Sequence, residues 1–336
     1  MSDNEKITLA HGGGGADAAE LIDREIVSRF AGDALSGLPD ASPLNLGGAD
    51  LLFSTDSHVV QPLFFPGGDI GSLSVYGTVN DVSVAGGKPL FISLALIIEE
   101  GFPMRTLRKV LDSVAEAARE CGVEIATGDT KVVGKGQCDQ IYLNTAGIGL
   151  KTPALNLGKQ RVAKGDAVLA SGTIGDHGMA VLAAREKLPI ENGPESDSAS
   201  VWPLVEAAAE FEDAVKFLRD PTRGGVAAVT NEIVANTDVG ILLNEAAIPV
   251  SRKTAGVAEI LGLDILNVAC EGRVLAVCAA DAAEDLLAAW KSARGGNGAA
   301  IIGVVTDEPE TVSLNTVSGG KRLVLPPAGE LLPRIC

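Results

Sequence analysis

The sequence is poor in cysteine and in positive charge, and both shortages exclude classes of protein. The five cysteines are odd in number and widely spaced, with no Cys-x-x-Cys pair, so neither a disulfide framework nor a thiolate metal site is indicated. Lysine and arginine number 27 against 44 acidic residues, and the net charge of −17 repels nucleic-acid phosphates and anionic lipid. We therefore expect no nucleic-acid partner and no membrane partner.

Long apolar runs are also missing. None approaches the roughly 20 residues that cross a bilayer, and the start, MSDNEKITLA, has no basic and apolar leader, so we expect a cytoplasmic protein. The composition of 46% apolar and 21% charged residues is typical of a folded protein, and 336 residues at about 150 per domain indicate two domains. The 40 glycines indicate many tight turns and close backbone approaches, as at phosphate sites.

Hydrophobic spacing predicts strands alternating with helices, and hence an α/β (α+β) chain. In the first half, strands are predicted at 51–56, 90–98, 123–127 and 141–150, with helices at 69–85 and 103–121. In the second half, strands are predicted at 167–170, 240–243, 274–278 and 300–305, with helices after 175 and at 203–211, 225–236 and 252–261. A further helix is predicted with Asp281 as its cap and Glu284 completing a capping box.

The stretch 151–165 shows neither the helical nor the strand spacing of apolar residues, and it therefore predicts the domain boundary. We divide the chain into a flexible glycine-rich segment and helix (1–40), an N-terminal domain (41–155), a C-terminal domain (156–325) and an extended tail (326–336). The tail contains three prolines and ends in Cys336, whose thiol could visit its own active site and a partner's. We expect Arg334 to favour the thiolate form of this cysteine.

Four aspartates stand where the chain runs into a turn or glycine. They are Asp56, Asp81, Asp129 and Asp220. Three carboxylates within ~4 Å would repel pairwise by about 4 kcal/mol at an effective dielectric of 20, so a cluster requires a divalent cation or raised pKa values. Hard oxygen ligands beside glycine turns suit Mg²⁺ with a polyphosphate, and Lys131 and Arg223 stand nearby to bind phosphate oxygens. Taken singly, each aspartate is equally typical of an ordinary turn or cap.

The amino-acid sequence of these segments resembles the motifs of a known superfamily. The segment Asp81-Val-Ser-Val-Ala-Gly-Gly-Lys-Pro89, with an upstream Ser-Thr-Asp and later Gly-Asp-Thr and Asp-Pro-Thr-Arg-Gly-Gly, is similar to aminoimidazole ribonucleotide synthetase, selenophosphate synthetase and thiamine monophosphate kinase. Within that group, the N-terminal His11-Gly-Gly-Gly-Gly and the terminal Pro333-Arg-Ile-Cys336 resemble the HypE family of hydrogenase maturation proteins. The first glycine loop lacks the serine usual in that family, and Pro221 replaces an alanine, but neither departure removes a ligand.

The resemblance implies a two-domain fold like that of aminoimidazole ribonucleotide synthetase. Its N-terminal domain binds ATP and forms a homodimer, in which its sheet joins that of a second subunit in a barrel, and its C-terminal domain is an α+β sandwich. The implied reaction begins when a HypF-type carbamoyltransferase places a carbamoyl group on Cys336. MgATP-dependent dehydration then converts the thiocarboxamide to a thiocyanate, which supplies the cyanide ligand of [NiFe]-hydrogenase iron through a HypC–HypD-type scaffold.

The resemblance also assigns roles to particular residues. Cys336 is the acceptor on the mobile tail, Lys131 and Arg223 stabilise phosphoryl charge, and Glu271 accepts the nitrogen proton. The expected Mg²⁺ ligands are Asp56, Asp81 and Asp129. The other residues expected at the ATP site are Thr130, Asp220, Gly224, Gly225 and His11. His177, at a predicted helix start, is expected to help form an anion pocket, with a structural role as the alternative.

Two other functions are compatible with the same segments. A small-molecule kinase or synthetase of the superfamily would use the same aspartates but would need no terminal thiol. A non-catalytic carrier would bind nucleotide only as a conformational switch. Consumption of ATP in the presence of a carbamoylated tail distinguishes the carrier from the enzyme.

Overall fold

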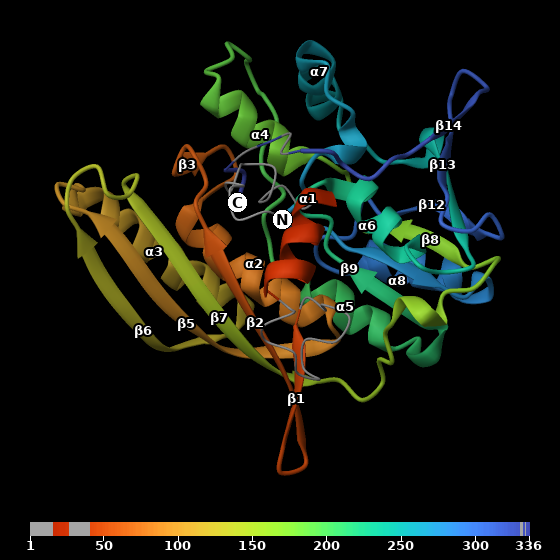
Figure 1. The fold of residues 1–336 in the computed structure, drawn as a ribbon, viewed down its shortest axis with the longest axis horizontal. Coiled ribbons are helices and arrows are strands. Elements are labelled where there is room, and N and C mark those ends of the chain that lie inside the picture. Colours follow the sequence, from red (N-terminus) through yellow and green to blue (C-terminus); the bar gives the residue numbers. More distant parts are fainter. Residues whose placement is uncertain (1–15, 27–40, 330–331, 333) are drawn as a thin grey trace.

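The computed structural model describes residues 16–26, 41–329, 332 and 334–336, and the account below concerns these residues. They build two mixed β-sheets that lie side by side, each covered by helices (Figure 1). This confirms the predicted two-unit α/β architecture. The predicted boundary at 155/156 falls between the last strand of the first sheet and the first strand of the second, and it stays a prediction.

The first sheet has the strand order β1-β2-β7-β5-β6. Its strands are β1 (Ser42–Leu46), β2 (Ala49–His58), β5 (Gly87–Glu99), β6 (Glu124–Val133) and β7 (Ile141–Lys151). A two-stranded hairpin of β3 (Phe64–Phe65) and β4 (Gly68–Asp69) follows β2. Helices α2 (Ile70–Val84) and α3 (Met104–Cys121) pack on one face of the sheet and form the core with the inward residues of β5 and β7. The predicted strands and helices of this half are confirmed, although β1 was missed and β6 runs six residues further than expected.

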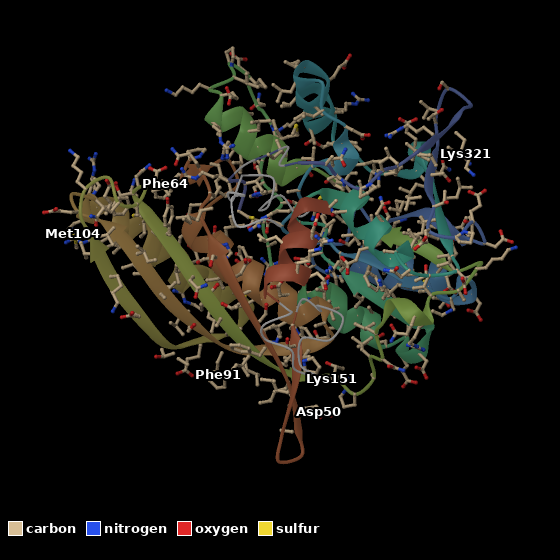
Figure 2. The ribbon with its side chains drawn as sticks, in the orientation of Figure 1. Asp50, Phe64, Phe91, Met104, Lys151 and Lys321 are labelled. Carbon is tan, nitrogen blue, oxygen red and sulfur yellow. The ribbon has the colours of Figure 1, made fainter. Side chains whose placement is uncertain are left out.

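The other face of this sheet is apolar and exposed. Phe91, at the rim of the sheet in Figure 2, is 43% exposed, and Ile97 is 42% exposed. Leu150 on β7 is 46% exposed. The strand β6 forms one edge, and nearly all of its residues are exposed. Large apolar side chains on a continuous sheet face are typical of a surface that another protein covers.

Helix α2 is the central helix of the molecule. Its first turn is closed by a capping box, in which the Asp69 carboxylate accepts hydrogen bonds from the backbone of Gly71 and Ser72. Of its 15 residues 13 are buried, because it contacts the first sheet and α3 on one side and α5 and β9 on the other. In Figure 1 it lies between the two sheets. Residues on α2 can therefore contact both halves of the chain.

The second sheet has the order β14-β13-β10-β12-β8-β11-β9 and helices on both faces. Its strands are β8 (Ala167–Ala170), β9 (Val215–Arg219), β10 (Gly240–Asn244), β11 (Leu275–Cys278), β12 (Ala300–Thr306), β13 (Val312–Asn315) and β14 (Lys321–Leu323). The alternation of β8 shows the two faces: Val168 and Ala170 pack in the cluster of α6 (Gly225–Val234), and Ala167 and Leu169 pack in that of α5 (Trp202–Ala209) and α8 (Ala283–Ser292). The remaining helices are α1 (Ala16–Leu21), α4 (Asp176–Arg185) and α7 (Arg252–Leu261).

Two predictions for this half were incomplete or wrong. The strand β9 was missed, because Lys216 and Arg219 interrupt its apolar pattern. The capping box at Asp281 was wrong, since α8 begins after Ala282 and has no side-chain cap. Among the described helices, none is long and apolar enough to cross a membrane.

Candidate active site

The end of the chain is docked against the segment that follows β2. The backbone N–H of Val59 donates to the main-chain oxygen of Cys336 at 3.0 Å, and that of Gln61 donates to the carbonyl of Arg334 at 3.2 Å. The Ile335 side chain is 3% exposed and packs in the core of the first sheet. Two backbone hydrogen bonds therefore fix the last three residues against this segment and hold Cys336 near the junction of the two sheets. The mobility expected for this tail stays a prediction.

The Cys336 thiol faces Arg223, from the loop after β9. The Nε–H of Arg223 donates to Sγ at 3.1 Å. Burial raises the pKa of the thiol to about 12, and the nearby Glu271 and Asp56 carboxylates add to this rise against the lowering effect of Arg223. The docked cysteine is therefore a neutral thiol. The predicted role of Arg334 was wrong: its guanidinium binds the carbonyl of Val59 and the carboxylate of Asp139.

The carboxyl groups of Glu271 and Asp56 interact with this thiol and with Arg223, and Asp220 interacts with both of these carboxyl groups. Glu271 is 2% exposed, and its Oε1 has no hydrogen-bond partner among the described residues. Burial raises its pKa well above the usual value, and the charges of Asp220 and Asp56 add to this rise, so the site favours the protonated form of Glu271. Asp220 is 5% exposed, and burial raises its pKa to about 6. The site thus brings together two buried carboxyl groups of raised pKa, Glu271 and Asp220.

Asp56 and Asp81 lie on the shared face of β2 and α2. The Ser54 hydroxyl donates to Oδ2 of Asp81 at 2.6 Å. Two residues further along the same face of β2, Asp56 lies so near α2 that a Cβ on Gly77 would approach its Oδ2 to 2.9 Å. Gly77 and Asp81 are one helical turn apart, so the two carboxylates are near neighbours. These are two of the three predicted Mg²⁺ ligands.

The third, Asp129, is not with them. The backbone pairs Asp129 with Ala95, Ala95 with Asn144, and Asn144 with Ser57. Paired residues point to the same face, so Asp129 shares the exposed face with Ser57, whereas its neighbour Asp56 points to the helices. Three strand spacings of about 4.8 Å also separate them. One chain therefore does not form the predicted cluster, and no group of three or more His, Cys, Asp or Glu among the described residues could hold a metal.

Thr130 and Lys131 lie beside Asp129 on the edge strand β6, away from Arg223. Lys131 Nζ is 3.0 Å from Asp129 Oδ2, and both side chains are more than 60% exposed. The expectation that Gly-Asp-Thr forms the end of a strand was wrong, because β6 continues through it to Val133.

The two glycines of the Asp-Pro-Thr-Arg-Gly-Gly segment shape the turn into α6. Gly224 is the N-cap with φ +79°, and Gly225 lies so close to the carbonyls of Leu266 and Val268 that a Cβ would be 2.6 Å from each. This tight turn presents Arg223 to the thiol. Their expected contact with phosphate stays a prediction, and His11 lies outside the described residues.

His177 contacts the tail. Its Nε2 is 2.7 Å from the carbonyl of Ile335, which can only accept, so Nε2 carries the proton. Burial lowers its pKa to about 4, and the ring is neutral. Its Nδ1 therefore accepts from the Ser196 hydroxyl at 2.8 Å. The anion-pocket interpretation is not supported.

Comparison with known proteins decides the family. Residues 39–151 match the N-terminal domain, and residues 163–314 the C-terminal domain, of AIR synthase related proteins. The chain is 46% identical to carbamoyl dehydratase HypE of Cupriavidus necator over 333 residues, covering 98% of this chain and 95% of that one. A structure described as a HypE–HypF complex superposes with a TM-score of 0.87 at 46% identity, covering 91% of this chain and 99% of the other. One of HypE in complex with ATP gives 0.82 at 41% identity, covering 98% and 100%.

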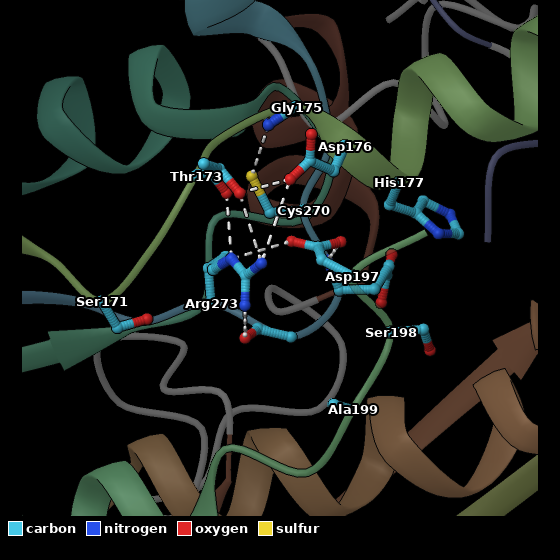
Figure 3. A network of polar contacts seen from close by, with 12 residues as sticks. Ser171, Thr173, Gly175, Asp176, His177, Asp197, Ser198, Ala199, Cys270 and Arg273 are labelled. Carbon is cyan, nitrogen blue, oxygen red and sulfur yellow. Dashed lines mark hydrogen bonds and ion pairs between the residues drawn. The ribbon is translucent and has the colours of Figure 1, made fainter. Parts of the chain in front are cut away.

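The chain belongs to the HypE family of carbamoyl dehydratases. Within this HypE fold, sequence reasoning missed a buried network around Asp197 and Arg273 (Figure 3). This network holds the backbone of Glu271 in place. Oδ1 of Asp197 accepts from the backbone N–H of Glu271 at 3.1 Å, and Oδ2 of Asp197 lies 3.4 Å from Nε of Arg273. The same Arg273 Nε donates to the carbonyl of Thr173 at 2.9 Å. The only signal in the sequence was Arg273, two residues after Glu271.

Asn80 was also missed, although it precedes Asp81 in the segment that carries the resemblance. Its side-chain amide donates to the carbonyl of Glu271 at 2.9 Å and to that of Ala199 at 3.0 Å. Its Oδ1 accepts from the backbone N–H of Val201 at 2.9 Å. In this HypE-family chain, the residue next to Asp81 on α2 thereby binds the backbone that carries Glu271.

Proposed function

We propose that this chain dehydrates a carbamoyl group carried on its own Cys336, and so supplies cyanide for the iron of [NiFe]-hydrogenase. As a member of the HypE family it is a carbamoyl dehydratase of hydrogenase maturation. The observation that carries the finer proposal is the docked thiol, 3.1 Å from Arg223 Nε and beside the buried Glu271. A terminal thiol placed in this way has no use in a small-molecule kinase.

The surroundings of Cys336 suit this chemistry. A carbamoyl group on Sγ adds an oxygen and an amide nitrogen, for which the site offers a guanidinium donor in Arg223 and an unpartnered carboxyl oxygen in Glu271. Loss of water from the amide requires that the nitrogen gives up its protons. A raised pKa makes the ionised carboxylate of Glu271 a stronger base, so this residue is our candidate for the group that takes a proton.

ATP and Mg²⁺ fit the residues on the α2 side of this site. Asp56 and Asp81 are hard oxygen donors, and the Gly224–Gly225 turn, Asp220 and Arg223 lie on the facing loop. When bound, ATP would supply the phosphoryl group that turns the amide oxygen into a good leaving group. Arg223 would bind transferring phosphoryl charge, and Asp197 and Asn80 would hold Glu271 in position meanwhile.

We further propose that the chain is a homodimer built on the exposed face of the first sheet. Five side chains on that face are between 39% and 46% exposed, namely Phe53, Phe91, Ile97, Ile148 and Leu150. Covering them with the same face of a second chain would remove this apolar surface from water. Asp129, Thr130 and Lys131 lie on β6 at that interface, so their expected roles at the nucleotide depend on the dimer.

The partners follow from the same proposal. A HypF-type carbamoyltransferase would load Cys336, in keeping with the HypE–HypF complex to which the chain is similar. A HypC–HypD-type scaffold would receive the cyanide. Both steps require Cys336 to leave its docked position.

The test follows the mass of the C-terminal peptide. After incubation with the carbamoyltransferase and its substrates, the peptide should gain the mass of a carbamoyl group, and MgATP should then remove the mass of one water. Loss of water without ATP, or a label on Cys121, Cys138, Cys270 or Cys278, would contradict the proposal. ATP binding with no change in the loaded peptide would support a non-catalytic carrier.

A further inference from the structure

Helix α4 carries two side chains that bind the tail through its backbone. His177, in the first turn, donates from Nε2 to the carbonyl of Ile335 at 2.7 Å. Arg185, the last residue of the helix, donates from Nη2 to the carbonyl of Arg334 at 2.6 Å. Two consecutive tail carbonyls are therefore bound by one helix. Both bonds are made to the backbone of the tail, so they depend on the position of its main chain and not on its side chains.

His177 is held in a fixed orientation for this contact. The ring is fully buried, and Phe65 packs edge-on against it with ring centroids 5.4 Å apart. The Ser196 hydroxyl at Nδ1 selects the tautomer that has its proton on Nε2. Ser196 is itself held, because its backbone N–H donates to the carbonyl of Pro66 at 2.8 Å.

Arg185 joins the tail to the segment on which it docks. Its Nε donates to the carbonyl of Gln61 at 2.8 Å, while Nη2 reaches the carbonyl of Arg334. The backbone N–H of Gln61 donates to that same Arg334 carbonyl. One guanidinium thus bridges the two backbone segments, a geometry that a lysine ammonium does not reproduce.

The register set by these contacts decides where the thiol lies. With Ile335 bound to His177, the main-chain oxygen of Cys336 meets Val59 and its Sγ meets Arg223. A shift of the tail by one residue would move the Cα of Cys336 by about 3.8 Å and break the 3.1 Å contact between its Sγ and Arg223. A contact that fixes the main chain by one residue is therefore sufficient to aim the thiol.

We propose that His177 and Arg185 form a tail clamp, a pair of positioning residues that sets the register of Cys336 in the site and limits the release of the tail. The clamp rests on the proposed function for its purpose, since the cysteine must alternate between this site and its partners. It acts on the tail backbone, so the clamp holds the thiol before and after the carbamoyl group is attached.

The test measures the alkylation rate of each cysteine with iodoacetamide in the intact protein, followed by peptide mass. The docked Cys336 thiol is protonated and reacts slowly, whereas an undocked one is more reactive. His177→Phe keeps an aromatic ring against Phe65 but lacks the donor. Loss of one net hydrogen bond should raise the undocked population, and with it the Cys336 rate, about fivefold. Neither ATP nor a partner enters the assay, so its failure is separate from failure of the proposed function.

The chain supplies its own control in Cys270 and Cys278, which are both fully buried. Faster alkylation of Cys336 with unchanged rates at these two supports the clamp. His177→Gln, which keeps an N–H at similar reach, should stay within about twofold of the parent chain. Equal acceleration at all three cysteines in His177→Phe, or an unchanged rate at Cys336, overturns the proposal.

Discussion

Replacing Glu271 with glutamine separates its proposed chemistry from its role in packing. The native side chain is buried and its pKa is raised, which favours the uncharged form, so the amide is close to it in shape and in charge. We expect Glu271→Gln to fold and to accept the carbamoyl group. Dehydration should slow by 10²- to 10⁴-fold, the usual contribution of a general base, which corresponds to about 3–5 kcal/mol of activation free energy. The measurement is single-turnover loss of water from the C-terminal peptide.

The same variant should change how stability depends on pH. Because the folded pKa of Glu271 is raised, the native state binds a proton that the unfolded state releases above its pKa of about 4.5. This contribution to stability is fully present below the unfolded pKa and is lost as pH rises towards the folded one, at about 1.4 kcal/mol per pH unit. Glutamine has no such proton, so Glu271→Gln should gain stability relative to the parent chain as pH rises.

Urea unfolding of both proteins at a series of pH values gives this difference directly, and subtraction cancels the groups that do not interact with Glu271. Glu116→Gln is the matched control, because Glu116 is exposed on α3 and should change neither quantity. A difference that stays flat with pH would refute the raised pKa of Glu271. Dehydration within threefold of the parent rate would remove it as the base.

The remaining predictions concern the nucleotide, the dimer and the two stages of the reaction. Asp81→Asn should keep its circular dichroism but lose Mg²⁺-dependent ATP turnover, and turnover at the parent rate would exclude Asp81 from the site. Phe91→Asp places a charge on the exposed sheet face, so light scattering should show a monomer where the parent chain is a dimer; an equal mass for both proteins would contradict the proposed interface. Lys131→Ala should be carbamoylated but stall before dehydration, and loss of water from its C-terminal peptide at the parent rate would contradict this. Cys336→Ala should bind ATP and take up no carbamoyl label, and a labelled peptide would contradict that.

Much of the fold could be predicted because local patterns fix it. The residues of α3 alternate strongly between polar and apolar faces, and Gly122 at φ +69° ends the helix where the sequence indicated. The strand β9 was harder, since its lysine and arginine bind acidic partners, Asp166 and Glu232, that are distant in sequence. Such pairings become visible only when the chain is folded.

The candidate site was also predicted only in part, because its sequence motifs are local and its geometry is not. Asp56, Asp81, Glu271 and Cys336 stand in segments whose sequence is distinctive, and the fold brings them together. Asp129 has an equally distinctive segment, but the side of the sheet to which it points depends on strand register, and one residue reverses it. The sequence pattern identifies a residue type and does not determine that direction.

The burial of α2 has a consequence for how distant relatives of this chain can be found. A helix with one solvent-exposed face, such as α3 with four buried residues in 18, tolerates substitutions at most of its positions with little loss of stability. In α2 a change at nearly any position disturbs packing on one sheet or the other. Over long divergence, substitutions should therefore accumulate more slowly in residues 70–84 than in residues 104–121, and the α2 segment should be the better probe for remote members of the superfamily.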